Sequence, residues 1–253
     1  MRKSIFGVLG GLMILLLLSG CIPDDELSTP VTVNLNLVMG TNLPGINHVE
    51  FYNTVIAVQQ IKFYGIREEG SDIFFSSQPT VPFGIYAIKK NQPASKIDVF
   101  DIPQGVYNQM RWEIKTKEID DDYYEDYFDD KLEEYIDVDD FGIVIEGKYK
   151  RLNGSEILLF IAIDPTEILL METFNTGGNN QLSLISGKTY NLILEINPYI
   201  AIQNIERILL ENADADEEDD IEYIEISSDE NEDLYERILF RLKNTVKAII
   251  EEQ

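Results

Sequence analysis

Apolar and polar residues alternate along much of the chain, which is the pattern of strands with one buried face. In residues 31–37, valine and leucine alternate with threonine and asparagine, and in 107–115 Met110, Trp112 and Ile114 fall on one face. Further strands are expected at 49–64 with a break near Asn53, 73–76, 97–100, 168–172, 182–185, 189–196 and 221–226. The pattern predicts a mainly β protein.

One hairpin is marked by its turn residues. Asn153 and Gly154 separate two strand patterns, at residues 148–152 and 157–163. Because Asn-Gly favours the two positive φ angles of a type I′ turn, we predict a tight hairpin with that turn.

Helical periodicity appears only after residue 198. Pro198 can begin a helix with Ile202, Ile205 and Leu209 on one face. Ser228 and Asp229 can cap a final helix, which we expect to pack on a sheet. Its apolar face would comprise Leu234, Ile238, Leu242, Val246 and Ile249.

Many short strands followed by late helices favour an antiparallel β-sandwich with C-terminal helices. We expect the sandwich over residues 31–198, interrupted by an acidic insertion at 119–141. Residues 199–253 would form an α+β extension packed on the sandwich. A separate small α+β domain beginning near Pro198 is the alternative.

The first residues resemble the signal peptide of bacterial lipoproteins. Arg2 and Lys3 precede an apolar run, residues 5–18, that ends in the lipobox Leu18-Ser19-Gly20-Cys21. The resemblance implies removal of residues 1–20, acylation of Cys21 with chains such as palmitate, and a tether at residues 21–30. An uncleaved anchor or an ordinary secretory signal is the alternative.

The lipobox implies a location and a partner. Two or three acyl chains on Cys21 would hold the protein firmly to a lipid bilayer without a transmembrane helix. We therefore expect a protein of the bacterial cell envelope, on the periplasmic or extracellular side. Cys21 is the only cysteine, so disulfides and thiolate chemistry are excluded once it is acylated.

The charge excludes some partners. The chain has 46 acidic and 20 basic residues, and loss of Arg2 and Lys3 with the signal would lower the net charge from −26 to −28. Phosphate backbones and anionic headgroups repel such a chain, which argues against nucleic acid and against a polybasic membrane contact. Cations and basic partners remain compatible.

A turn and the strand after it resemble a known family. Ile102-Pro103-Gln104-Gly105-Val106-Tyr107, followed by Arg111, is similar to a turn of bacterial lipoproteins built on an uncharacterised immunoglobulin-like or prealbumin-like sandwich. The segments 182–190 and 192–195 continue the similarity, which covers roughly residues 31–200. The resemblance implies a β-sandwich, and the family offers no assigned activity or catalytic residue.

Signatures of enzymes are weak. His48 is the only histidine, which we interpret as a loop residue, and neither a zinc-ligand spacing nor a Gly-x-Ser-x-Gly motif is present. We therefore predict that the protein is not an enzyme and assign no catalytic residue. A glycan hydrolase that uses two carboxylates is the alternative, although the abundance of acids prevents a choice of the pair.

Acidic and aromatic residues are interleaved at 120–140. Such a surface suits a basic partner or calcium, because rings supply contact area and carboxylates steer association. A solvated loop or short helix whose aromatic rings dock on the sandwich is the simpler interpretation. The candidate partner-binding residues are Tyr123, Tyr124, Tyr127, Asp126 and Asp129.

A second acidic segment matches part of the EF-hand pattern. Six acids at residues 214–225 occupy positions 1, 3, 5, 7, 9 and 12, but Asp219 stands where the loop needs glycine, and 221–226 reads as a strand. A solvated acidic turn is the leading interpretation, and looser Ca²⁺ binding is the alternative. The candidate metal ligands are Asp214, Asp216, Glu218, Asp220 and Glu225.

Together these features predict a membrane-anchored envelope lipoprotein that serves as a noncatalytic binding or structural module. Its partner would be an unknown protein or glycan, with Ca²⁺ as a candidate cofactor. The alternative is a lipid-tethered glycan hydrolase.

Overall fold

The computed structural model describes residues 28–79, 84–120, 137–218 and 220–253. The signal segment, Cys21 and nearly all of the expected tether lie outside these ranges. The candidate partner-binding residues of the acidic insertion lie outside them too: Tyr123, Tyr124, Tyr127, Asp126 and Asp129.

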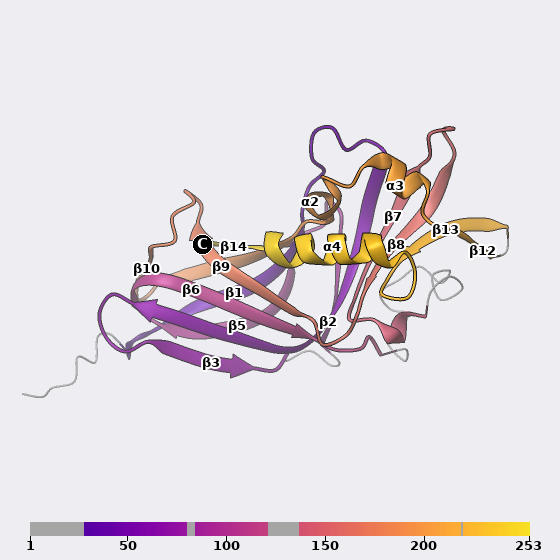
Figure 1. The fold of residues 1–253 in the computed structure, drawn as a ribbon. Helices are drawn as coiled ribbons and strands as arrows, with labels where there is room; N and C mark the ends of the chain where they lie inside the picture. The colour runs from indigo at the N-terminus through magenta and orange to yellow at the C-terminus, as the bar shows by residue number, and fades with distance from the viewer. Residues whose placement is uncertain (1–27, 80–83, 121–136, 219) are drawn as a thin grey trace, which may run out of the picture.

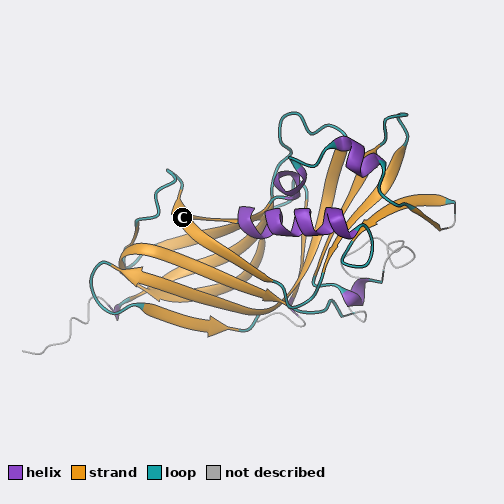
Figure 2. Cartoon of the chain, viewed as in Figure 1, coloured by secondary structure: helices purple, strands orange, loops and turns teal. Residues whose placement is uncertain are grey.

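The described residues form one sheet of 14 strands, curled into a half-barrel (Figure 1). Strands dominate the chain and helices are few (Figure 2), so the prediction of a mainly β protein is confirmed. The strands are β1 Pro30–Met39, β2 Val49–Arg67, β3 Ile73–Ser77, β4 Ile85–Lys89, β5 Ser95–Pro103, β6 Gly105–Thr116, β7 Ile143–Lys150, β8 Glu156–Ile163, β9 Ile168–Asn175, β10 Leu182–Leu184, β11 Thr189–Ile196, β12 Asp216–Glu218, β13 Ile221–Ile226 and β14 Lys247–Glu252.

The sandwich prediction required a wholly antiparallel sheet, but the sheet is mixed. Its order is β12-β13-β8-β7-β2-β6-β9-β14-β11-β1-β5, with β10 beside β6 and with β3 and β4 beside β2. The pairs β1–β11, β13–β8 and β14–β9 are parallel. Alternation marks which face of a strand is buried but carries no information on the direction of its neighbour, and parallel partners are joined by long crossovers.

Strand β2 links the two halves of the sheet, because it pairs with β3 and β6 along one part and with β4 and β7 along another. Its register with β7 shifts between Phe51 and Asn53, where the sequence predicted a break. Residues 54–58 are buried on both faces, since Val55 and Ala57 face a second apolar cluster.

The main core lies on the concave side of the sheet. Met110, Trp112 and Ile114 of β6 are buried as predicted. The Trp112 ring packs against Phe63 and Phe100, with ring centroids 4.8 and 5.4 Å away. Aromatic contacts of this kind add to the burial of apolar area.

The hairpin between β7 and β8 is confirmed, but the predicted turn type is wrong. Gly154 has a φ of +92°, whereas Asn153 is not among the residues with positive φ. The Gly154 N–H bonds to the Arg151 carbonyl at 3.0 Å, which is a type I turn followed by a left-handed glycine. The Asn153 Oδ1 accepts the Ser155 N–H at 2.8 Å, a bond to the backbone two residues on that is common at turns.

The helices are α2 Pro198–Ile202, α3 Arg207–Glu211 and α4 Glu232–Thr245, with a 3₁₀ turn η5 at Val138–Asp140. The final helix begins after Asn231, not at Ser228 or Asp229, and ends before Val246. Residues 246–250 were expected to be helical because Val246 and Ile249 fit the 3.6 period. They also alternate, with Ala248 and Ile250 buried and Lys247 exposed, and the structure forms the strand.

The region after residue 198 is built into the sheet. Strand β13 extends one end beside β8, and β14 lies between β9 and β11. Both α2 and α4 contribute buried side chains to the main core. This part of the chain therefore completes the sheet instead of covering a finished sandwich.

Candidate functional site

The acidic segment 214–225 forms a hairpin, which is not the geometry of an EF-hand loop. Strand β12 pairs antiparallel with β13, with Asp216 opposite Tyr223, and Asp220 sits in the turn with a φ of +64°. An EF-hand loop must instead wrap its oxygens around one point and enter a helix. Among the described residues, no group of three or more His, Cys, Asp or Glu side chains is placed to hold a metal ion.

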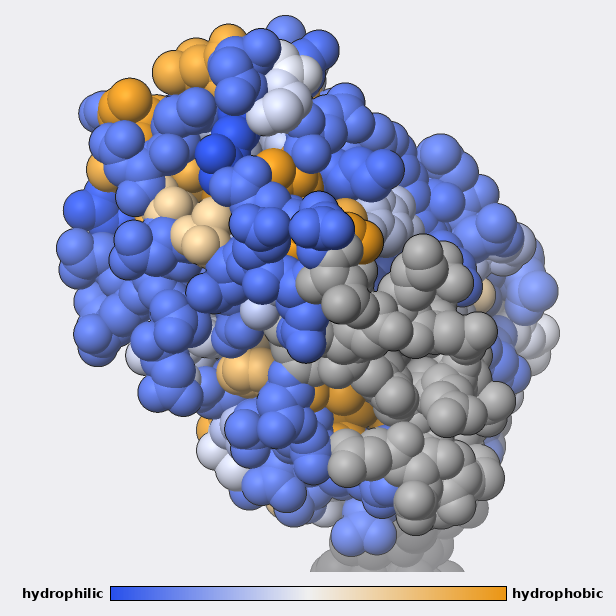
Figure 3. All heavy atoms as spheres, turned by 90° about the vertical axis from the view of Figure 1, so that its right-hand side faces the viewer, coloured by the Kyte–Doolittle hydropathy of each residue, from blue (hydrophilic) through white to orange (hydrophobic). Residues whose placement is uncertain are grey.

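The candidate metal ligands are spread along this hairpin. Asp214, Asp216, Glu218 and Asp220 are exposed, while Glu225 is half-buried on β13. Seen from this end, the described surface is mainly hydrophilic, with smaller hydrophobic patches between (Figure 3). The arrangement matches the leading interpretation of the sequence, a solvated acidic turn.

Asn231 fixes the base of the hairpin, a role that sequence reasoning missed. Its side-chain amide donates to the carbonyls of Asp214 at 3.1 Å and Glu225 at 2.6 Å, and its Oδ1 accepts the Asp214 N–H at 2.9 Å. Asn231 adopts a left-handed conformation, with φ of +57°, which asparagine tolerates better than most residues. An asparagine just before a helical pattern was the available signal.

Glu225 is the carboxyl of this region with a perturbed acidity. Burial raises its pKa, and the charges of Glu230 and Asp216 raise it further, while a hydrogen bond with Ser227 lowers it. A raised pKa favours the protonated carboxyl in the folded protein.

His48 lies in a loop, as interpreted from the sequence. Partial burial and the nearby Arg207 lower its pKa. Its ring meets Tyr149 edge-on, with centroids 6.2 Å apart, so the contact is a packing contact.

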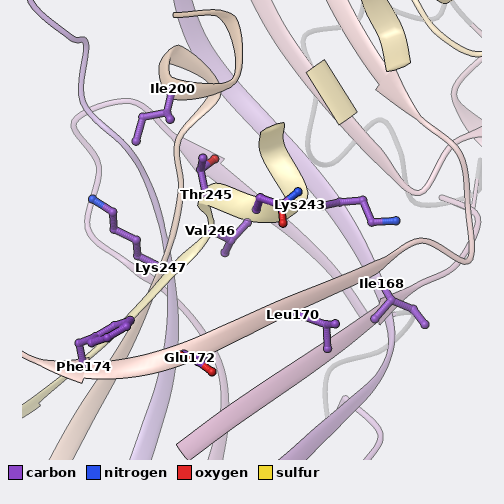
Figure 4. Close-up of a pocket in the computed structure, with 10 residues that line it drawn as sticks. Ile168, Leu170, Glu172, Phe174, Ile200, Lys243, Thr245, Val246 and Lys247 are labelled. Atoms are coloured by element: carbon purple, nitrogen blue, oxygen red, sulfur yellow. The ribbon is translucent and has the colours of Figure 1, made fainter. Parts of the chain in front are cut away.

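A concave site lies in a groove between β9 and the end of α4 (Figure 4). Its volume is about 640 Å³. One wall is the outward face of β9, and the other is the passage from α4 into β14, with α2 contributing Ile200. The lining residues are Ile168, Leu170, Glu172, Phe174, Ile200, Lys243, Asn244, Thr245, Val246 and Lys247.

The apolar floor of the groove comes from a strand that is apolar on both faces. Leu169 and Met171 point into the core, while Ile168 and Leu170 point outward and remain 37% and 53% exposed. The signal in the sequence was the unbroken run Ile168-Leu169-Leu170-Met171, because a strand with one solvated face should alternate.

The groove exists because β14 pairs only with the last residues of β9. Their pairing runs only from Thr173 to Asn175, since residues before Ala248 descend from α4. Residues 168–172 pair with β6 on one side. On their other side, no described strand pairs with them.

The groove carries one uncommitted positive charge. The Lys243 Nζ lies 2.5 Å from the Glu167 carboxylate, and Glu172 accepts a hydrogen bond from Gln109 at 2.6 Å. Lys247 is exposed and makes no ion pair with any described carboxylate. It belongs to a stretch, residues 237–250, that has four basic and no acidic side chains in a strongly acidic chain.

The groove can therefore bind an apolar group together with a negative charge. Its lining contains one carboxyl, that of Glu172, and neither histidine nor cysteine.

Comparisons of the chain with protein-family models, with curated proteins and with solved structures found no match. In the part of the chain that the structure describes, no helix has both the length and the apolar character needed to cross a bilayer.

Proposed function

We propose that this protein is a lipid-anchored, noncatalytic binding module of the bacterial cell envelope, and that the groove between β9 and α4 is its binding site. The groove carries this proposal. Its volume falls within the usual range of ligand sites, and it combines an apolar floor with a free lysine. Membrane attachment rests on the lipobox Leu18-Ser19-Gly20-Cys21.

The anchor is tested at Cys21. Cells that express the full chain are fed a palmitate analogue carrying an alkyne, and the protein is followed in the membrane and soluble fractions. Wild-type protein should carry the label and sediment with membranes, and Cys21→Ser should lose both properties. A Cys21→Ser protein that keeps its label would refute acylation at this site.

Ligand binding is tested with 8-anilino-1-naphthalenesulfonate, a fluorescent probe with apolar rings and one negative charge. The purified acylated protein should enhance the fluorescence of the probe, and Leu170→Glu should weaken binding at least tenfold. Val99→Glu is the matched control, because Val99 is 42% exposed on β5, outside the groove lining. Equal binding by all three proteins would remove the groove as the site.

We also propose kinship with the immunoglobulin-like or prealbumin-like lipoproteins. Support comes from the turn that carries the resemblance. The buried Tyr107 hydroxyl donates to the Pro103 carbonyl at 2.6 Å, as the corner tyrosine of immunoglobulin-like sandwiches bonds to backbone a few residues upstream. Burial raises the pKa of Tyr107 to about 12, so this hydroxyl stays protonated as the donor.

The alternative is a lipid-tethered glycan hydrolase, and the raised pKa of Glu225 favours it. Such enzymes need a protonated carboxyl as general acid beside a second carboxylate. Release of reducing ends from isolated cell-wall glycan, lost in Glu225→Gln but kept in Glu217→Gln, would replace the binding proposal.

A further inference from the structure

The proposed function leaves the ligand open, and the walls of the groove identify its chemistry. Resting on that function, we infer that the groove binds an extended peptide segment of a partner protein, with apolar and acidic residues in alternation. The segment adds a strand to the edge of β9 along residues 168–172.

The edge of β9 is the first reason. Residues 168–172 offer backbone donors and acceptors on the side away from β6, with no described strand beside them. Five residues of strand span roughly 16 Å, enough for a short peptide to pair. Exposed strand edges bind peptides by main-chain hydrogen bonds, while pockets for alternate side chains give specificity.

The protein itself already places a strand on this edge. Further along β9, Ala248, Ile249 and Ile250 of β14 pair in parallel with Thr173, Phe174 and Asn175. A bound peptide would occupy the same line upstream of β14. Strand β14 closes the groove at the Phe174 end, so the peptide can extend only past Ile168.

The side chains of the groove define what the peptide presents. Ile168 and Leu170 on one wall and Val246 on the other form an apolar lining (Figure 4), which fits every second residue of the peptide. Phe240 lies one turn before Asn244 on the same face of α4 and is 70% exposed, so it extends the apolar surface beyond the groove.

Charge complementarity selects the other residues of the peptide. Lys247 makes no ion pair with a described carboxylate, although Glu195 lies opposite it on β11. Arg241 and Lys243 precede it at the end of α4, and Lys243 is paired with Glu167. The chain as a whole repels acidic segments, because its net charge is −26. An acidic peptide would therefore be directed to this local basic stretch and disfavoured elsewhere.

A lipid chain fits these walls less well. It would cover the free edge of β9 without hydrogen-bonding its N–H and C=O groups, and buried polar groups without partners are costly. A peptide strand satisfies them.

The test uses the purified acylated protein in nanodiscs and a fluorescein-labelled peptide, Glu-Val-Glu-Ile-Glu-Val-amide. Anisotropy should show saturable binding that weakens with salt, and Lys247→Glu should weaken it at least tenfold. Lys89→Glu, at an exposed lysine on β4, should leave the affinity unchanged. The Lys-Val-Lys-Ile-Lys-Val analogue should not bind.

Strand addition is tested separately through the backbone. Hydrogen exchange of amides in residues 168–172 should slow when the peptide binds, and N-methylation of alternate peptide amides should abolish binding. Binding without protection of these amides, or equal binding of the N-methylated peptide, would overturn strand addition.

The outcomes separate the inference from the function beneath it. If the anilinonaphthalene probe binds through Leu170 but the acidic peptide does not, the inference falls and the binding site stands. If neither the probe nor the peptide binds to the folded wild-type protein, both the inference and the proposed binding site fall. Lys243 and Lys247 would then only protect the strand edge against aggregation.

Discussion

A single oxygen atom, the Tyr199 hydroxyl, joins α2 to the longest strand of the sheet. Tyr199 is fully buried, and its hydroxyl accepts the Phe51 N–H at 3.0 Å and donates to the Phe51 carbonyl at 3.3 Å. Phe51 lies where the register of β2 with β7 shifts. Tyr199→Phe should therefore be strongly destabilising although it leaves the ring packing intact.

The magnitude follows from the two hydrogen bonds. Each is worth about 0.5–1.5 kcal/mol, and a buried group left without its partner costs about 1–3 kcal/mol. Because the Tyr199 hydroxyl bonds to two backbone groups of Phe51, we expect a loss of about 2–4 kcal/mol in the free energy of unfolding. For a domain of this size the melting midpoint should fall by roughly 4–16 °C.

Urea unfolding followed by circular dichroism measures this loss. The m-value should stay unchanged, since the surface exposed on unfolding is the same. Tyr64→Phe is the control, because Tyr64 is 36% exposed on the outer face of β2. A loss below about 0.5 kcal/mol for Tyr199→Phe would refute the argument that the two hydrogen bonds of its hydroxyl stabilise the contact between α2 and β2.

Three further predictions concern the charged hairpin and the close packing of β7. Burial raises the pKa of Glu225 above its ordinary value of 4.5 in the folded protein, so its contribution to stability is present below pH 4.5 and is lost as the pH rises through the raised pKa. The urea midpoint of the wild-type protein should therefore fall over this pH range, and Glu225→Gln should flatten the fall. An unchanged pH profile in the variant would contradict the burial argument. Calcium and magnesium at equal millimolar concentration should raise the melting midpoint equally, because the hairpin does not gather its carboxylates; a rise selective for calcium, lost in Asp216→Asn, would restore the metal site. Gly147→Ala should destabilise by about 1–3 kcal/mol in urea, because its Cβ would lie 2.6 Å from the Glu50 carbonyl oxygen, whereas unchanged stability would mean that β2 moves freely there.

Local pattern predicted the strands well where one face is buried and the other is solvated. Strand β6 shows this, since Met110, Trp112 and Ile114 are buried as their spacing indicated. Residues 54–58 of β2 do not alternate, because both faces are covered, so there the sequence indicates a strand but not which face is buried. Which strands pair, and in which direction, depends on contacts between residues far apart in sequence, so the three parallel pairs were not predictable.

The candidate site was missed for a related reason. The sequence drew attention to acids, and acids were too numerous to discriminate among positions. The groove instead depends on Ile168 and Leu170, which look like ordinary core residues, and on the point at which β14 leaves β9. Residues 246–250 fit both the two-residue period of a strand and the 3.6-residue period of a helix. The sequence therefore did not indicate where α4 ends, and the groove at that end could not be predicted.

The position of β14 has a consequence for the order of folding. Strand β14 follows every other strand in the sequence, yet it lies between β9 and β11 in the interior of the sheet. During synthesis or export, both neighbours must wait with free edges until residues 247–252 arrive. The nascent protein is therefore exposed to mispairing and to chaperone capture until its final stage of folding, and a stop codon shortly before Lys247 should be far more damaging than its position suggests.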